Sequence, residues 1–108
     1  MKTIEIITIP FTDPRRAKAF YTGIGFEVLV EASMPNGETW IQLGLPGQTT
    51  SIAFLRFQSM ILETEHIEKE IQALRAKGIE VGPIDDQPWG RFAWFKDPDG
   101  NGLCLHEK

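Results

Sequence analysis

The chain has little cysteine and histidine and no long apolar run. A single cysteine among 108 residues excludes a disulfide within the chain. No apolar stretch approaches the roughly 18 residues that a membrane-spanning helix requires, so we expect no contact with a membrane. Basic residues form no run longer than Arg15-Arg16, and the net charge is −4. Because nucleic-acid binding needs a basic surface, we expect none.

The amino-terminal segment, MKTIEIITIP, is typical of a strand. It carries a glutamate inside its apolar stretch and has no small-residue cleavage site, so it does not match a secretion signal. We therefore expect a cytoplasmic location. The hydrophobic fraction of 42% and the charged fraction of 24% are those of an ordinary soluble globular protein.

One pattern occurs twice in the chain. The sequence GFEV at residues 25–28 is followed later by GIEV at residues 78–81, and each lies after a stretch with apolar residues at helical spacing. The two apolar stripes consist of Ala17, Phe20, Tyr21 and Ile24 in the first stretch and Ile67, Ile71 and Leu74 in the second. The sequence therefore predicts two equivalent amphipathic helices.

Capping residues set the expected ends of these helices. Thr12 or Asp13 can cap the first helix, and Pro14 suits its first turn. Thr64 is the candidate cap of the second helix. Gly78 is placed to end that helix, because glycine readily takes the left-handed conformation that follows a helix.

One strand is expected before each helix and three after it, with turns rich in proline or glycine between them. The expected strands are residues 3–9, 26–32, 38–43 and 51–56 in the first half and residues 59–64, 79–82, 91–96 and 102–107 in the second. The order is β-α-β-β-β, twice. This predicts an α+β fold in one domain over residues 1–108, with repeat 1 at about 1–57 and repeat 2 at about 58–108.

Two such βαβββ repeats can form a curved mixed sheet whose free face is a cup. The alternative is a plain α+β sandwich with a filled core. We favour the cup, because the internal repeat is hard to explain otherwise.

Two segments, DPRRAKAFYTGIGFEV (13–28) and QPWGRFAWFKDPDGNGLCL (87–105), resemble the vicinal oxygen chelate superfamily. This group includes glyoxalase I, extradiol dioxygenases, fosfomycin-resistance enzymes and bleomycin-resistance proteins. The first segment is similar to its Asp, helix, Phe-Tyr, Gly-Phe entry, and the second to its Trp-Gly-Arg, aromatic strand and Asp-Pro-Asp-Gly-Asn turn. Together with the repeat, the resemblance covers essentially the whole chain and implies the glyoxalase-like cup.

Metal-dependent members of that superfamily hold a divalent cation in the cup with His, Glu or Gln ligands from several strands. Carried over by motif and repeat, the ligand positions fall on Ile6, Ala53, Ser59 and Cys104. A site needs nitrogen or oxygen donors at about 2.0–2.2 Å from the ion, and these side chains do not supply them. We therefore expect this chain to bind neither a metal nor a cofactor.

Three further polar residues are assigned outside the cup. His66 is expected at a helix start as a surface residue. Glu5 would enter the cup only if the first strand slipped by one residue, and that slip would turn its apolar residues the wrong way. Arg91 is expected at the surface or rim, with anchoring of an anionic ligand group as the alternative.

The turn DPDGN predicts the register of the last hairpin. Residues 97–99 suit a type I turn, and Gly100 suits the left-handed residue of a G1 bulge. Asp97 then pairs with Asn101.

Counting outward from this turn, Trp94 lies opposite Cys104, and Phe92 lies opposite His106. Side chains alternate along a strand, so these four share one face. The resemblance places Cys104 on the cup side, and the other three are therefore expected to line the cup. The residues expected to point to the helices are Phe95, Leu103 and Leu105.

The first half gives a weaker assignment of the same kind. Ile41 and Leu43 suit the helix side of their strand, which leaves Trp40 and Gln42 for the cup. The first strand is expected to line the cup with Ile6 and Thr8.

The expected ligand-binding residues are Thr8, Trp40, Gln42, Phe92, Trp94, Cys104 and His106. Aromatic walls with few polar groups are typical of small-molecule sites, and aromatic faces stack on planar or cationic ligands. The alternative is that the two cup tryptophans fill it as core. His106 is the candidate catalytic base, with a structural role as the alternative because no carboxylate partner is identifiable. Cys104 is expected to be a buried small hydrophobe rather than a nucleophile.

The leading functional prediction is a glyoxalase/bleomycin-resistance-like protein that binds a small, partly aromatic molecule without a metal. One alternative is a lyase or dioxygenase of the same superfamily, with an atypical metal site or acid–base catalysis by His106. Another is a structural role, with a filled cup and a rim used for assembly. The resemblance also implies a homodimer, since members often dimerise and the exposed sheet edges gain from being covered.

Overall fold

The computed structural model describes residues 1–108 as two compact units. The first unit comprises residues 6–58, and the second comprises residues 1–5 and 59–108. Strand β1 (Thr3–Ile9) runs across the boundary in sequence. The units therefore differ from the two predicted repeats in the assignment of the first five residues. Neither helix is long and apolar enough to cross a membrane.

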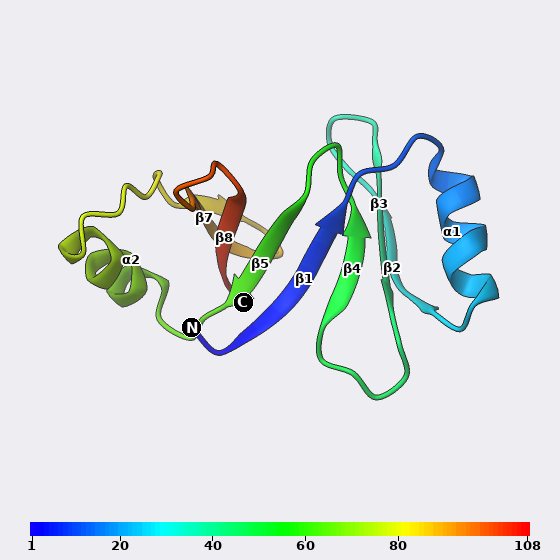
Figure 1. Cartoon of the computed structure of the whole chain (residues 1–108), viewed down its shortest axis with the longest axis horizontal. Coiled ribbons are helices and arrows are strands. Elements are labelled where there is room, and N and C mark those ends of the chain that lie inside the picture. Colours follow the sequence, from blue (N-terminus) through cyan, green and yellow to red (C-terminus); the bar gives the residue numbers. More distant parts are fainter. The chain divides into compact units, whose positions relative to one another are not determined.

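The first unit contains a mixed sheet and one helix (Figure 1). Its strands follow the order β2-β3-β4-β1, with β1 and β4 parallel and the other pairs antiparallel. Besides β1, the elements are α1 (Pro14–Gly23), β2 (Glu27–Ser33), β3 (Thr39–Gly44) and β4 (Ser51–Phe54).

The second unit repeats this plan. Its strands follow the order β5-β8-β7-β6, with β5 and β8 parallel and the other pairs antiparallel. The elements are β5 (Ser59–Glu63), α2 (Ile67–Ala76), β6 (Asp85–Gln87), β7 (Gly90–Lys96) and β8 (Gly102–Glu107). The predicted α+β class and the twofold β-α-β-β-β order are confirmed.

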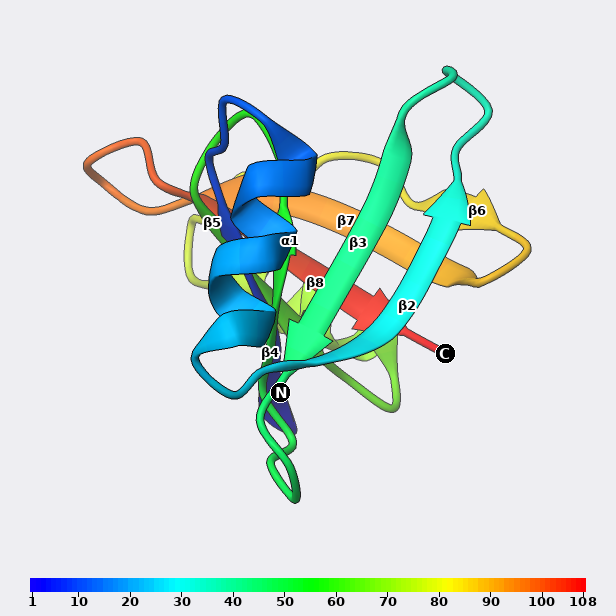
Figure 2. The same cartoon turned by 90° about the vertical axis from the view of Figure 1, so that its right-hand side faces the viewer.

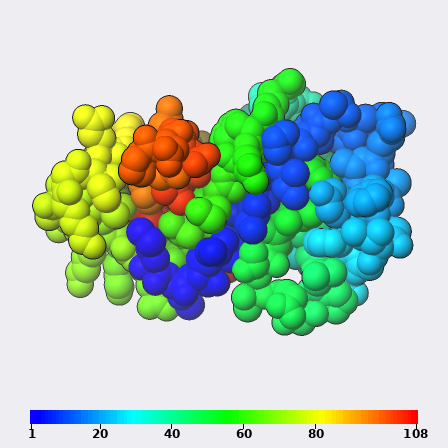
Figure 3. Space-filling view, viewed as in Figure 1, coloured from blue at the N-terminus to red at the C-terminus, as the bar shows by residue number.

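Helix α1 begins where the sequence predicts. The Asp13 carboxylate accepts hydrogen bonds from the backbone N–H groups of Arg15 and Arg16, at 3.0 and 3.4 Å. Asp13, rather than Thr12, is therefore the cap, and Pro14 occupies the first turn because its missing N–H has no partner to lose. No residue of α1 is fully buried, and its blue atoms form a continuous part of the surface in Figure 3.

Helix α1 packs on β3 and β4 through one apolar cluster (Figure 2). Ile41, Leu43 and Phe54 are buried there, and Ala17 and Tyr21 of the helix pack against them. Ile41 and Leu43 therefore face the helix, as predicted. Burial of one such side chain contributes about 1.5–3 kcal/mol, so this cluster fixes the helix on its sheet.

The predicted cap of helix α2 is wrong in detail. The cap residue is His66, and its own side chain makes no capping bond. The Thr64 hydroxyl accepts from the His66 N–H at 3.2 Å. This N–H lies one residue before the first turn of the helix, so the bond does not cap the helix. The Glu107 carboxylate accepts from the Ile67 N–H at 2.9 Å instead. The cap thus comes from a strand far along the chain, which a local sequence pattern does not reveal.

The core of the second unit lies between α2 and strands β7 and β8. Its buried members are Ile67, Ile71, Leu74, Val81, Ala93, Phe95 and Leu105. Leu103 packs against this cluster while partly buried. The prediction that Phe95, Leu103 and Leu105 point to the helix side is confirmed.

The predicted strand at 79–82 is wrong. Those residues have no strand pairing, and the strand of this region is the polar β6, whose residues the sequence predicts to lie in a turn. Val81 is buried in the α2 core, and Gly82 donates one backbone bond to the Trp94 carbonyl at 2.9 Å. Pro83 then has no N–H with which to continue a ladder. The apolar residues here serve packing, while Asp86 pairs with Arg91 across the β6–β7 hairpin.

Candidate functional site

The β7–β8 hairpin has the predicted register. The Asp97 N–H donates to the Asn101 carbonyl at 3.0 Å, and Gly100 has a φ of 87°. The Asp97 carboxylate accepts from the Asn101 side chain and from the N–H groups of Asn101 and Asp99, at 2.8–2.9 Å. These bonds, the Asn101 side chain first, hold the pKa of Asp97 below its ordinary value. The turn is therefore locked by its own residues.

Four side chains share one face of this hairpin, which we call the hairpin face: Phe92, Trp94, Cys104 and His106. Trp94 pairs with Cys104 and Phe92 pairs with His106, as predicted. The Phe92 and His106 rings stack with centroids 4.4 Å apart and planes within 2°. Trp94 remains 38% exposed, and its indole extends over Gly102, where an added Cβ would lie 3.7 Å from the ring.

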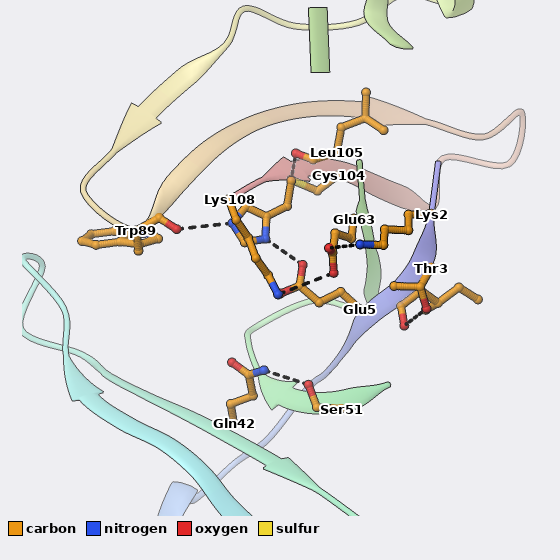
Figure 4. A network of polar contacts seen from close by, with 12 residues as sticks. Lys2, Thr3, Glu5, Gln42, Ser51, Glu63, Trp89, Cys104, Leu105 and Lys108 are labelled. Atoms are coloured by element: carbon orange, nitrogen blue, oxygen red, sulfur yellow. Dashed lines mark hydrogen bonds and ion pairs between the residues drawn. The ribbon is translucent and has the colours of Figure 1, made fainter. Parts of the chain in front are cut away.

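His106 is buried and held at both ring nitrogens. Its Nδ1 lies 2.7 Å from the Glu5 carboxylate, and its Nε2 lies 3.4 Å from the Trp89 carbonyl. Figure 4 shows Glu5 and Trp89 placed for these contacts. Sequence reasoning found no carboxylate partner and turned Glu5 away from His106, and that assignment is wrong. The partner lies 101 positions away in the chain.

The Glu5 carboxylate raises the pKa of His106. Burial acts to lower the pKa of His106, but the hydrogen bond and charge of Glu5, aided by the Trp89 carbonyl, outweigh it. The net pKa of His106 is raised above its ordinary value. An imidazolium donates from both nitrogens, which matches the two acceptors that it meets.

Gly90 leaves room for this imidazole. A Cβ at Gly90 would clash with the His106 ring and with the Glu107 carbonyl. Gly90 also has a φ of 143°, a conformation that residues with a side chain rarely adopt. The start of β7 is therefore shaped to accept the ring.

Cys104 behaves as a buried small hydrophobe, as predicted. It is fully buried, and its Sγ lies 3.4 Å from the Leu105 carbonyl. Burial raises the pKa of the Cys104 thiol to about 12. Since the thiolate is the nucleophile and the metal ligand, this side chain supplies neither role near neutral pH.

The candidate residues of the first unit form a polar row. Thr8, Ala53 and Gln42 are paired across β1, β4 and β3, so they share a face. The Trp40 Nε1–H donates to Gln42 Oε1 at 3.2 Å, and Gln42 Nε2–H donates to Ser51 Oγ at 2.8 Å. Figure 4 shows the second contact. Sequence reasoning missed Ser51, although its pairing beside Gly44 follows from the β3–β4 register.

Thr8 is fully buried in this row. Its hydroxyl donates to the Phe57 carbonyl at 3.0 Å. Trp40 and Gln42 are half-buried. The structure therefore brings the three predicted residues of the first unit onto one face, where the Trp40 indole contacts the Gln42 amide.

Residues 3–105 match the model of the Glyoxalase/Bleomycin resistance protein/Dioxygenase superfamily. The chain belongs to this superfamily. Two relatives from Bacillus subtilis (strain 168) are similar along their whole length. YwkD is 30% identical, with 100% of this chain and 98% of that protein covered. YetH is 27% identical, with 99% of each covered. Both are uncharacterized proteins.

The superfamily fold also appears in solved structures. Methylmalonyl-CoA epimerase from Mycobacterium tuberculosis has a TM-score of 0.80 at 15% identity, with 95% of this chain and 85% of that chain covered. At this identity the likeness concerns the fold alone. The predicted glyoxalase-like fold is thereby confirmed.

The metal chemistry found in parts of this superfamily does not fit the residues present here. Ile6 and Ala53, at two of the four ligand positions, carry no donor atom. Ser59 offers a neutral hydroxyl, and Cys104 offers a thiol whose pKa is about 12. No group of three or more His, Cys, Asp or Glu side chains lies close enough together to hold a metal ion. The donor set of a metal-dependent member is therefore missing.

Arg91 and His66 lie outside the hairpin face. Arg91 pairs with Glu68 at 2.8 Å, Asp86 at 3.0 Å and Glu107 at 3.4 Å. Its charge is thus shared among carboxylates of three elements, in line with the surface assignment. His66 is exposed at the start of α2, as predicted.

Proposed function

We propose that the protein is a metal-free member of its superfamily that binds a small, partly aromatic molecule on the hairpin face. The observation that carries this proposal is the partial exposure of Trp94 beside the stacked rings of Phe92 and His106. An indole that is 38% exposed on a strand paired on both sides is a large apolar surface left to water. A planar ligand would cover it.

The chemistry of the face favours stacking. Aromatic pairs in offset or edge geometry contribute about 0.5–1.5 kcal/mol beyond the area that they bury. Small-molecule sites combine such walls with a few polar groups that fix orientation. On the hairpin face, the polar groups beside the rings are the imidazole of His106 and the carboxylate of Glu5.

We propose that Thr8, Trp40 and Gln42 also take part in ligand binding, through the face that they share within the first unit. Their support is the shared face and the bond between the Trp40 indole and the Gln42 amide. Replacing Gln42 by Leu removes the amide and breaks both of its bonds. We expect this variant to bind the ligand more weakly. The loss of binding free energy should exceed the loss of free energy of unfolding.

The proposal is tested by screening planar aromatic compounds for thermal stabilisation and then measuring affinity by fluorescence. Trp94→Leu removes the stacking ring but keeps apolar bulk, and we expect about tenfold weaker binding. Trp89→Leu is the matched control, because Trp89 is 50% exposed in the β6–β7 turn and outside the hairpin face. Equal affinities for the wild type and both variants would rule out the hairpin face as the site.

An enzymatic role is the second candidate, and the Glu5–His106 contact favours it. A carboxylate at 2.7 Å orients a histidine and supports acid–base chemistry. In this version the protein is a lyase or another superfamily enzyme that uses His106 without a metal. Turnover of a superfamily substrate that His106→Ala abolishes would establish it, and turnover unchanged by that substitution would remove His106 from the chemistry.

We further propose a homodimer in the cytoplasm. Strand β2 lies at the edge of its sheet, and all seven of its residues are exposed. Val28, Leu29 and Val30 are 42%, 52% and 40% exposed along this edge. Edge strands with apolar side chains are usually covered by a partner, and a second copy of the chain is the partner that is always present.

A further inference from the structure

The surroundings of His106 leave its ring little freedom. The ring is stacked on Phe92, both nitrogens face oxygen acceptors, and the backbone at Gly90 lies against its Nε2 side. The His106 side chain is only 9% exposed. A ligand that approached Nε2 would have to displace the Trp89 carbonyl and the start of β7.

This geometry separates two roles that a histidine can have. A general base needs a free lone pair within reach of the proton that it takes. Both ring nitrogens of His106 instead face oxygen acceptors, and one face of its ring is used by Phe92. In the binding role proposed above, this placement makes His106 a fixed ring within a wall.

We propose that Glu5 is a positioning residue of the hairpin face. Its carboxylate holds His106 as an imidazolium, flat against Phe92, and the resulting pair of parallel rings forms the wall beside Trp94. This inference rests on the function proposed above and specifies how the same site is regulated: the wall is complete only while His106 carries its second proton.

The other charged groups near His106 do not provide this contact. Glu63 is paired with His106 across β5 and β8, but its carboxylate lies 3.6 Å from the amines of Lys2 and Lys108. Figure 4 shows these side chains with Glu5. The charge of Lys108 opposes protonation of His106. Removal of the Glu5 carboxylate therefore removes the charged group that contacts the His106 ring directly.

The direction of the pH dependence follows from the raised pKa of His106. The stabilising contact is fully present below the unfolded-state pKa of about 6.5. It is lost as the pH rises through the higher folded-state value. The wall therefore loosens, and ligand affinity falls, as the pH rises through this folded-state value.

The experiment follows the ring by NMR and binding by fluorescence. Imidazole signals of His106 are titrated in the wild type, in Glu5→Gln and in the control Glu63→Gln, with a histidine-containing model peptide as the reference. Anilinonaphthalene sulfonate is the aromatic probe, and Trp94→Leu reports whether it occupies the hairpin face. We expect His106 to titrate above the ordinary histidine value of about 6.5 in the wild type and in Glu63→Gln.

In Glu5→Gln we expect the His106 titration to move to lower pH and probe affinity at about pH 6.5 to fall about fivefold, as for loss of one hydrogen bond of about 1 kcal/mol. Identical titrations in the wild type and Glu5→Gln would overturn the inference. If Glu5→Gln does not fold, a wild-type His106 that titrates at or below the ordinary histidine value of about 6.5 overturns it equally. A probe whose binding ignores Trp94→Leu contradicts the proposed function instead, whatever the titrations give.

Discussion

At the residue scale, Gly90 and His106 depend on each other. Gly90 has a φ of 143° and lies directly against the imidazole ring. A side chain at this position would therefore add both backbone strain and a clash with His106. Gly100 has a φ of 87° but open space around it. Comparing the two glycines therefore separates backbone strain from the clash with His106.

We predict that Gly90→Ala lowers the free energy of unfolding by roughly 2–4 kcal/mol, from strain and from displacement of the ring. Gly100→Ala should cost only about 1–2 kcal/mol, because its cost is the left-handed backbone alone. Urea unfolding measures both. Equal costs for the two variants would show that the contact between Gly90 and His106 adds nothing.

The pairing of Trp94 with Cys104 and of Phe92 with His106 could be predicted from sequence. The turn at 97–100 is local, and strand alternation carries its register outward. The contact of His106 with Glu5 could not be predicted in this way, because it joins strands whose relation depends on the whole unit. The same holds for Ser51, whose partner Gln42 lies on another strand.

At the element scale, helix α2 is held by a charge from outside the helix. Glu107 of β8 accepts the Ile67 N–H and also pairs with Arg91, which reaches Glu68 in the first turn of the helix. The Ile67 N–H first, and then Arg91, hold the pKa of Glu107 below its ordinary value. One carboxylate therefore links strands β7 and β8 to the start of α2.

We predict that Glu107→Ala lowers the free energy of unfolding by about 1 kcal/mol near neutral pH, as for other lost helix caps. Because the folded-state pKa is depressed, this contribution is present above about pH 4.3 and lost as the pH falls through the folded value. Thermal melts from pH 3 to 7 test this. Glu80→Ala, an exposed position, is the control; a Glu107→Ala deficit that does not shrink in acid would contradict the cap.

The elements themselves were mostly predictable, and the exceptions have one cause. Asp13 caps α1 from the adjacent residue, so a local pattern finds it. The cap of α2 is distant, and the strand expected at 79–82 fails because Val81 packs beneath α2 instead of pairing. Strand β6 is polar and short, and it forms because β7 offers it a partner. Tertiary contacts decided each of these cases.

At the scale of the whole molecule, the exposed β2 edge leads to a prediction about assembly. We expect sedimentation velocity at micromolar concentration to give a homodimer, and Leu29→Lys on the edge strand to shift it toward monomer. Lys77→Ala is the control, since Lys77 is exposed at the end of α2 and lies outside β2. A wild type that stays monomeric at these concentrations would contradict the proposed dimer.

The central claim is that a superfamily member without the metal donor set binds an aromatic ligand through the hairpin face. The most direct measurement is the affinity of a ligand from the aromatic screen, taken before and after exhaustive chelation, with the metal content determined on the same samples. We predict far less than one equivalent of divalent metal per chain and an affinity that chelation leaves unchanged. About one equivalent of metal, removed by the chelator together with binding, would contradict the account.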